Sequence, residues 1–275
     1  YEKEEYEKSQ AYKKKNAKFA NITGLFSLAL TLAFFFFDGF KYIDEIARSY
    51  SSNTILITLI FFGIILIGSD IINTPFSIYK TFVIEAEFGF NKTTKKTFIL
   101  DKIKGMLMTI VLGGGLLALL VWFYEFAGTN FWIYAWVVVA LFSVFMNLFY
   151  SKLIVPIFNT QKPLEEGELK SAIEDYAQKV GFTIHNIFVI DGSKRSTKAN
   201  AYFSGFGKQK RITLYDTLIH DLETEEIVAV LAHEVGHYKR KHIVFNLTSS
   251  IILTGFTLWM LSLFVSLPIF SEALG

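Results

Sequence analysis

The 275-residue sequence contains no cysteine, and its positive and negative charges nearly balance. The absence of cysteine excludes disulfide bonds and thiol catalysis, and it is typical of a protein whose working part faces a reducing cytoplasm. A formal net charge of +2 gives no basis for a nucleic-acid partner. The first residues do not form a cleavable signal peptide, because charged side chains stand where an apolar core is needed. Because the sequence starts at Tyr1 and not at methionine, we expect a fragment or a processed chain.

Charge is also absent from five long runs, and these runs are the main indication of the protein class. Hydrophobic residues make up 52% of the chain, and each run is long enough, or nearly so, to cross a bilayer. The runs are residues 19–37, 49–69, 106–124, 131–150 and 243–270. The alternative is five buried helices of a soluble protein. It is weak, because helices that are apolar on all sides would need a larger polar shell than this chain offers.

Lysine and arginine are distributed unevenly between these runs. Residues 1–18 hold six of them, 38–54 two, 70–105 six, 125–130 none and 150–242 thirteen. Cytoplasmic loops are the ones enriched in lysine and arginine. The alternation therefore predicts that the N-terminal segment, the 70–105 loop and the 150–242 region all face the cytoplasm.

A short motif lies in the last of these regions. His233, Glu234 and His237 form the H-E-x-x-H pattern of zinc metallopeptidases. A polar, acidic start at residues 224–226 and the apolar residues after it predict an α-helix through the motif. Residues four apart share one face of a helix, so both imidazoles can bind one Zn²⁺ while Glu234 takes a proton from the attacking water. The alternative is an amphipathic helix with two surface histidines.

His242 is not expected to join this site. It lies five residues after His237, about 140° further around an unbroken helix. The third histidine of the metzincin pattern would have to stand where this chain has Ile243. We interpret His242 as an interfacial residue beside the basic residues 239–241, which would anchor the chain at the membrane surface.

The region before the motif is predicted to be a small α+β unit. Acidic residues after Pro163 begin a helix that ends at Gly181. Residues 183–190 are predicted as a strand, and residues 199–206 and 211–215 as a β-hairpin. A peptidase needs an edge strand to hold an extended substrate. Residues 199–206 are our candidate, and a hairpin that only braces the motif helix is the alternative.

Two further features concern the membrane region. Pro75 predicts a break or kink after the second run, with a helix continuing as far as Gly89. Gly113, Gly114 and Gly115 lie in the middle of the third run, where three glycines weaken a helix. They fit either a close contact between helices or a widened cavity, and we favour the close contact.

Five motifs around the motif helix share one resemblance. They are DGSKRS at 191–196, NAYFSG at 200–205, KRI at 210–212, DTL at 216–218 and VLAHEVGH at 230–237. FGFNKTT at 88–94 and PLEEGEL at 163–169 belong with them. Together they closely resemble the type I CAAX prenyl proteases, which are integral-membrane zinc metallopeptidases. The resemblance covers nearly the whole chain, from about residue 10 to residue 250.

The resemblance implies a mainly α fold, a polytopic bundle of membrane helices enclosing a chamber, with a small α+β zinc metallopeptidase domain on the cytoplasmic side. It implies that His233 and His237 bind one Zn²⁺ per active site and that Glu234 is the catalytic residue. It also implies that Asn200 and Ala201 line the substrate groove. The reaction would remove the last three residues from a prenylated C-a-a-X substrate, farnesylated or geranylgeranylated, at the lipid bilayer.

The sequence departs from the family pattern in two ways. We count five spans where the family has seven, and the lysine-rich start resembles the loop that follows the family's first span. The family's third zinc ligand is a glutamate in an E-x-x-x-D motif, and Glu272 does not match it. We therefore expect that ligand beyond residue 275. Catalytic zinc usually has three protein ligands, so we expect this chain alone to lack a complete site.

These observations predict a membrane bundle at 1–150 with four spans and a cytoplasmic loop at 70–105. A zinc metallopeptidase domain at 151–242 and a fifth span at 243–275 follow. The leading function is processing of prenylated C-a-a-X substrates. The alternatives are a quality-control zinc protease that needs no prenyl group and an inactive membrane scaffold. The compartment would be the inner membrane of a bacterium, or the endoplasmic reticulum or inner nuclear membrane of a eukaryote.

Overall fold

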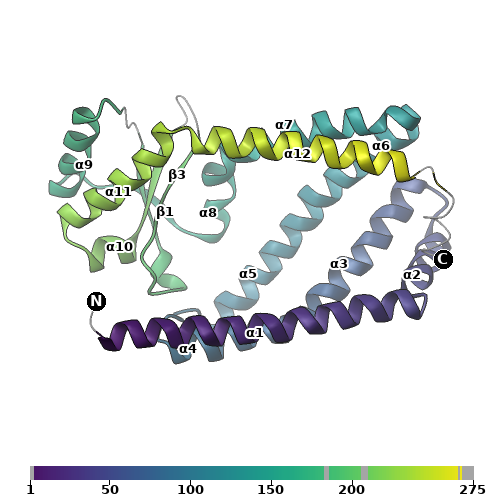
Figure 1. Cartoon of the computed structure of the whole chain (residues 1–275), viewed down its shortest axis with the longest axis horizontal. Helices are drawn as coiled ribbons and strands as arrows, with labels where there is room; N and C mark the ends of the chain where they lie inside the picture. Colours follow the sequence, from purple (N-terminus) through teal and green to yellow (C-terminus); the bar gives the residue numbers. More distant parts are fainter. Residues whose placement is uncertain (1–2, 183–185, 206–209, 266, 268–275) are drawn as a thin grey trace. The chain divides into compact units, whose positions relative to one another are not determined.

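The computed structural model describes residues 3–182, 186–205, 210–265 and 267, and most of them are helical (Figure 1). By packing, the chain divides into two compact units. The first contains residues 1–91, 105–135 and 258–275, and the second contains residues 92–104 and 136–257.

Five helical segments of the described chain are long and apolar enough to cross a membrane. They are Lys3–Phe36, Thr54–Glu87, Lys95–Ala127, Phe131–Phe158 and Ile243–Phe264. At most 6% of the residues in the most apolar stretch of each are buried within the protein. Such apolar, outward-facing surface is stable only in contact with lipid. The five predicted spans are confirmed, and the chain is a mainly α integral membrane protein with a small sheet.

The first unit consists almost entirely of helices. They are α1 (Lys3–Phe36), α2 (Gly39–Tyr50), α3 (Thr54–Tyr79), the π-helix η1 (Lys80–Ile84), α4 (Glu85–Glu87), the π-helix η2 (Thr109–Gly113), α6 (Gly114–Ala127) and the 3₁₀ turn η3 (Gly128–Asn130). The lysine-rich start and the first span form one continuous helix, α1. The link between the first two spans is itself helical, because α2 buries Ile43 and Ala47.

Pro75 does not end the helix, so of the predicted break or kink the break is wrong. Helix α3 runs through Pro75 to Tyr79 and continues into the π-helix η1. A proline removes one backbone N–H from the helix, here the one that would bond to the Ile71 carbonyl, and a local π-helical adjustment such as η1 is one way in which a membrane helix tolerates this. One turn earlier, the Thr74 hydroxyl donates to the Asp70 carbonyl at 2.6 Å and the Asn73 amide donates to the Ser69 carbonyl at 2.8 Å. The helix ends near Gly89, whose φ is +78°, as expected.

The three glycines of the third span line a cavity of about 770 Å³ between α3 and the η2–α6 segment. A Cβ added at Gly115 would meet no atom within 4 Å, and at Gly114 the nearest would be Leu59 Cδ2 at 3.9 Å. Helices α3 and α6 do contact each other, so the glycines combine the favoured helix contact, near Gly114 and Leu59, with the cavity that was the alternative. The π-helix η2 lies directly before Gly114, so the regular α-helical hydrogen bonding of the third span is interrupted beside the cavity.

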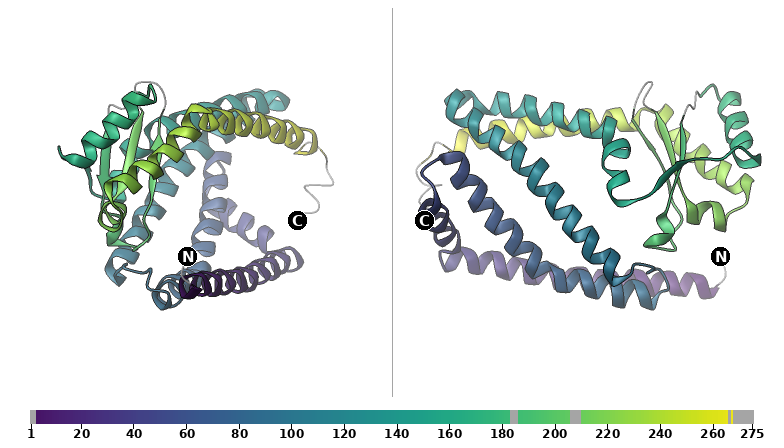
Figure 2. Two further views of the ribbon diagram at one scale, coloured as in Figure 1. Left: turned by 60° about the vertical axis from the view of Figure 1, so that its left-hand side comes forward. Right: turned by 180° about the vertical axis from the view of Figure 1, so that it is seen from behind.

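The second unit combines helices with the small sheet (Figures 1 and 2). Its helices are α5 (Lys95–Met108), α7 (Phe131–Leu153), α8 (Val155–Phe158), α9 (Glu168–Lys179), the 3₁₀ turn η4 (Gly192–Lys194), α10 (Asp216–Asp221), α11 (Thr224–Lys239) and α12 (His242–Val265), although the ends of α5, α7 and α12 extend into the first unit. The predicted helix after Pro163 is α9, which ends at Lys179, and Gly181 follows two residues later with φ +63°.

The sheet has four strands in the order β1-β2-β4-β3. The strands are β1 (Gln161–Pro163), β2 (Ile187–Ile190), β3 (Ala201–Ser204) and β4 (Arg211–Tyr215). The β2 and β4 strands are parallel, and the other two pairs are antiparallel. The predicted hairpin is confirmed by the β3–β4 pair, whereas residues 183–185 of the predicted strand lie outside the described residues. The sequence analysis missed β1, because three residues ending in proline do not read as a strand.

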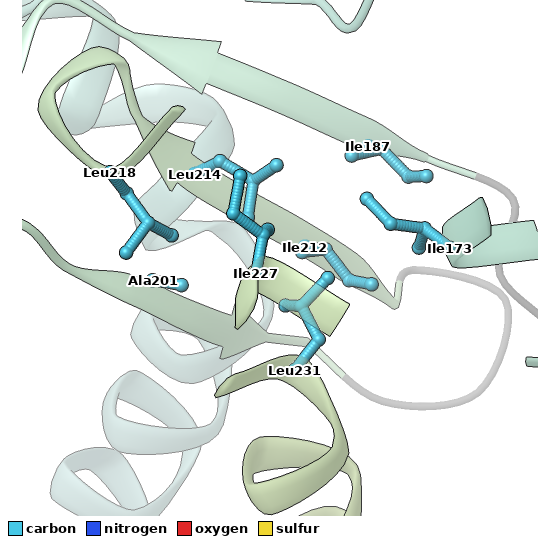
Figure 3. Close-up of a cluster of buried hydrophobic side chains, with 8 residues drawn as sticks. All are labelled: Ile173, Ile187, Ala201, Ile212, Leu214, Leu218, Ile227 and Leu231. Atoms are coloured by element: carbon cyan, nitrogen blue, oxygen red, sulfur yellow. The ribbon is translucent and has the colours of Figure 1, made fainter. Parts of the chain in front are cut away.

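One cluster of buried apolar side chains joins the strands to α9, α10 and α11 (Figure 3). It contains Ile173, Ile187, Ala201, Ile212, Leu214, Leu218, Ile227 and Leu231. Four of these residues belong to helices and four to strands. The helical residues pack against one face of the sheet, and this contact fixes α11 relative to β3 and β4.

Candidate metal centre and active site

Helix α11 is held against the core by one stripe of side chains. Ile227, Leu231 and Val235 follow at intervals of four and are only 1%, 1% and 2% exposed. Figure 3 shows Ile227 and Leu231 pointing toward the side chains of the sheet. Residue 233 lies about 200° around the helix from Leu231. This rotation places His233 on the exposed side, whereas Glu234 lies nearer the packed side and is half-buried.

The start of α11 is fixed by hydrogen bonds of the kind that the acidic residues predict. The Glu223 carbonyl accepts from the Ile227 N–H at 3.0 Å, and the Glu226 carboxylate accepts from the Glu223 N–H at 3.0 Å. This is the side-chain half of a capping box. The negative charge of Glu225 and Glu226 also favours the positive end of the helix dipole.

The motif lies within one unbroken helix, because α11 extends from Thr224 to Lys239. The α-carbons of His233 and His237 are therefore one turn apart, about 6 Å along the axis. The side chain of His237 lies outside the described part, and among the described side chains no group of three or more His, Asp or Glu could hold a metal. Two neutral imidazoles on one helix face suit the nitrogen-donor chemistry of zinc. They fit two of its ligands, and a third is needed from elsewhere.

The helix does not continue into the fifth span. Helix α11 ends at Lys239 and α12 begins at His242, with Lys241 at φ +56° between them. A left-handed lysine interrupts helical hydrogen bonding. The motif helix and the fifth span are thus two abutting elements. The side chain of His242 lies outside the described residues, so its interfacial role stays a prediction.

The candidate substrate strand lies at an edge of the described sheet and in contact with α11. Strand β3 pairs with β4 alone among the described strands. The Asn200 carbonyl accepts from the Tyr215 N–H at 3.0 Å, and the Asn200 side chain accepts from the Ala201 N–H at 2.9 Å. The Ala201 methyl belongs to the buried core and is 7% exposed, whereas Asn200 is exposed.

Tyr215 ends β4 beside this strand. Burial raises the pKa of the Tyr215 hydroxyl, and its hydrogen bond to the Asn200 side chain acts in the opposite direction. Burial outweighs the bond, so Tyr215 stays protonated over a wider pH range than an exposed tyrosine. The Asn200 amide is therefore held between Tyr215 and the backbone of the edge strand.

The residues of the DGSKRS and DTL motifs hold the loops beside the sheet. The Asp191 carboxylate accepts from the Asn159 side chain at 3.0 Å and from the Thr160 N–H at 2.9 Å. The Asp216 carboxylate accepts from the Ser193 N–H at 2.8 Å and from the Ser193 hydroxyl. These two aspartates therefore hold the loops at residues 159–160 and 193 in place, and none of these contacts involves the motif helix.

Sequence reasoning missed an ion pair between residues 94 positions apart. Arg195 donates to both Asp101 oxygens at 2.7 and 2.8 Å, and to the Phe158 carbonyl at 2.8 Å. The hydrogen bond to Asp101 raises the pKa of Arg195 above its ordinary value. Thr93 and Lys92 also donate to the Arg195 carbonyl. The two partners have no fixed spacing in the sequence, so no local pattern could have identified the pair.

Comparison with known proteins agrees with this arrangement. Residues 1–160 match the family model described as CAAX prenyl protease N-terminal, five membrane helices, and residues 163–272 match the one described as peptidase family M48. The boundary between the matches falls within β1, where the first four spans end and the sheet begins. Peptidase family M48 is a metallopeptidase family, so membership implies a metal cofactor.

Several curated proteins are similar over most of this chain. CAAX prenyl protease 1 of Saccharomyces cerevisiae is 39% identical over 252 residues, which cover 88% of this chain and 56% of that protein. The CAAX prenyl protease 1 homolog of Oryza sativa is 40% identical over 251 residues, covering 88% and 59%. The chain thus spans less than two thirds of the length of these relatives.

A solved structure shares the fold. The crystal structure of S. mikatae Ste24p matches with a TM-score of 0.94 and 36% identity, covering 100% of this chain and 65% of that one. The membrane helices, the small sheet and the motif helix therefore occur together in a known protein. On the evidence of both family matches, the chain belongs to the CAAX prenyl protease family of M48 peptidases.

Proposed function

We propose that this chain supplies the membrane helices and the motif helix of a zinc-dependent endopeptidase that removes the last three residues from prenylated C-a-a-X substrates. The observation that carries the proposal is α11, which holds H-E-x-x-H beside an edge strand in a membrane protein. The names of the similar proteins, CAAX prenyl protease 1 and its homologs, support the substrate class.

His233 and His237 are the proposed metal ligands. The two residues are four apart on the unbroken helix α11, and the buried stripe of Ile227, Leu231 and Val235 fixes the rotation of this helix about its axis. When bound, Zn²⁺ would supply Lewis acidity that activates water and polarises the scissile carbonyl. The third ligand is expected to be a glutamate beyond residue 275.

Glu234 is the proposed general base. It is half-buried at the edge of the packed face, next to His233, so its carboxylate has little freedom to reorient. In this position it would accept a proton from the attacking water and deliver it to the leaving amine. Catalysis by a positioned base typically contributes a factor of 10² to 10⁴ to the rate.

The edge strand β3 is the proposed substrate-binding element. Its backbone alternates, so that Asn200 and Tyr202 bond toward β4 while Ala201 and Phe203 direct their N–H and C=O groups to the open edge. An extended substrate would add to this edge as a further strand. The Asn200 side chain now bonds to the Ala201 N–H, so the substrate carbonyl would take its place. Asn200 and Ala201 therefore remain the proposed substrate-binding residues.

The metallopeptidase region 151–242 is proposed to face the cytoplasm, because thirteen of the 27 lysines and arginines lie between residues 150 and 242. A prenylated substrate would reach it along the lipid bilayer. The compartment depends on the host cell. It is the inner membrane in a bacterium, and the endoplasmic reticulum or inner nuclear membrane in a eukaryote.

The test is a cleavage assay on the complete, detergent-purified protein, read by mass spectrometry. A farnesylated C-a-a-X peptide should lose its last three residues, and a chelator should abolish the reaction. Glu234→Gln should lower kcat by a factor of about 10² or more while zinc content stays unchanged. Glu225→Gln changes an exposed glutamate of the same helix and should leave kcat unaltered.

Each negative result identifies a different alternative. Equal cleavage of the unprenylated peptide would replace the proposed substrate class with that of a quality-control protease. Bound zinc without cleavage of either peptide would also exclude C-a-a-X processing. Absence of both zinc and cleavage would leave a membrane scaffold as the remaining function.

A further inference from the structure

A second cavity, of about 410 Å³, lies in the second unit beside the ends of two spans. It is lined by Lys104, Pro156, Ile157, Phe158, Asn159, Thr160, Gln161 and Lys194. We propose that this cavity binds the headgroup phosphate of an anionic glycerophospholipid. The proposal goes beyond the proposed peptidase function and does not depend on it.

The charge of the cavity indicates an anionic ligand. Lys104 and Lys194 are the only charged residues in its lining. The two nearby carboxylates already accept hydrogen bonds, because Asp101 is paired with Arg195 and Asp191 accepts from Asn159 and Thr160. The Lys194 ammonium has no hydrogen bond or ion pair with a described residue. Asp101 is compensated by Arg195, whereas Asp191 bonds only to neutral donors here and keeps its charge, so two lysines beside one uncompensated carboxylate leave the site with a net positive charge.

Unpaired donors give a second, independent indication. Gln161 Oε1 accepts from Arg211 Nη1 at 2.9 Å, which fixes the orientation of the amide. Its Nε2 is then left buried without a hydrogen-bond partner among the described residues. Arg195 follows the lining residue Lys194 but does not itself line the cavity, and its buried Nη1 also lacks a partner among the described residues. Buried donors are nearly always paired, and Gln161 lines the cavity, so a small movement of its side chain would bring Nε2 to a phosphate oxygen there.

The position of the cavity selects a lipid as the source of the phosphate. Lys104 lies two residues before the uncharged run that starts at Met106, about 3 Å along the helix axis. The opposite wall is α8, which forms the last residues of the fourth apolar segment, Phe131–Phe158. Basic pockets between membrane helices on the cytoplasmic side bind anionic headgroups. The cavity is therefore at the depth where such headgroups lie.

The wall formed by α8 adds an apolar surface to the cationic one. Pro156 and Ile157 are exposed, and Ile157 retains 41% of its accessible surface. The Ile157 carbonyl accepts from Lys104 Nζ at 2.7 Å, which holds the ammonium against this wall. A ligand that joins a phosphate to a glycerol backbone and acyl chains would contact both surfaces, whereas inorganic phosphate would contact only the lysines.

The test uses native mass spectrometry on the complete, delipidated protein in detergent, titrated with dioleoylphosphatidylglycerol. Removing two lysines near a membrane surface, as in Lys104→Gln with Lys194→Gln, should weaken binding of the first lipid about 30-fold. The arginine pair, Lys104→Arg with Lys194→Arg, should retain binding, which excludes misfolding as the cause of the loss. Lys152→Gln with Lys162→Gln removes the same charge from exposed lysines outside the cavity and should change binding less than 3-fold.

Three results would overturn the proposal. One is an equal loss in the cavity and control pairs, which would indicate general surface attraction. Another is unchanged binding in the cavity pair. The third is inorganic phosphate that binds with the same lysine dependence and displaces the lipid at equal concentration, which would make this a free-anion site.

Discussion

The ion pair between Arg195 and Asp101 should contribute more to stability than any exposed ion pair of the protein. Its side chains are 24% and 25% exposed, and the guanidinium makes three hydrogen bonds. Arg195→Gln would remove the charge and leave the Asp101 carboxylate in a partly dry site. Asp101→Asn would leave the Arg195 guanidinium without its negatively charged partner.

The magnitude follows from the burial of the two partners. Breaking a fully buried pair typically costs 3–5 kcal/mol, and exposed pairs contribute about 0–1 kcal/mol. Because a quarter of each side chain reaches solvent, we expect about 2–3 kcal/mol for either single change. The double variant, Asp101→Asn with Arg195→Gln, should cost little more than one single change, because each single change already loses the shared interaction.

The assay is thermal unfolding of the complete protein in detergent, followed by intrinsic fluorescence. The pair of Arg48 and Asp44 is a suitable control, because its Nε–Oδ2 distance of 2.6 Å is nearly the same but its side chains are 63% and 40% exposed. Arg48→Gln should leave the unfolding temperature almost unchanged. Equal losses for Arg48→Gln and Arg195→Gln, or additive losses in the double variant, would refute the argument from burial.

Two further predictions concern the sheet and the motif helix. Leu231→Ala removes a side chain that is 1% exposed from the core under α11, so it should cost about 3 kcal/mol and lower zinc retention together with the unfolding temperature. Leu261→Ala, at an exposed position, should change neither zinc retention nor the unfolding temperature in detergent. Equal losses in the two variants would contradict the assignment of Leu231 to the core. Burial raises the pKa of Tyr215, so its stabilising contribution is complete below about pH 10, where unfolded tyrosine ionises, and is lost as the pH rises through the folded pKa. Tyr215→Phe should flatten the alkaline fall of a pH series of unfolding temperatures, and an unchanged slope would show that Tyr215 is not responsible.

The sequence by itself determined the elements whose signal is local. Five uncharged runs predicted the five spans, because the bilayer requires about twenty apolar residues in succession. The acidic start and the spacing of apolar residues predicted α11 and placed His233, Glu234 and His237 on it. The β3–β4 hairpin was predicted from two alternating runs close together in the chain. In each case, the residues that form the element are neighbours in sequence.

Only the tertiary structure decided which distant residues meet. The cavity at Gly113, Gly114 and Gly115 depends on side chains of α3, so the glycines alone could not distinguish it from a close contact. Pro75 by itself could not show whether the helix ends or continues, and in the structure α3 runs through it into the π-helix η1. Strand β1 forms only because β2 offers it a partner.

The same distinction separates the candidate active site from what supports it. The motif predicts the catalytic chemistry, since two histidines four residues apart lie on one face of a single helix. The pairing of Arg195 with Asp101, and the two lysines of the second cavity, join segments about 90 residues apart. Such contacts are set by the packing of helices and sheet and not by local spacing, and for that reason they are absent from any pattern in the sequence.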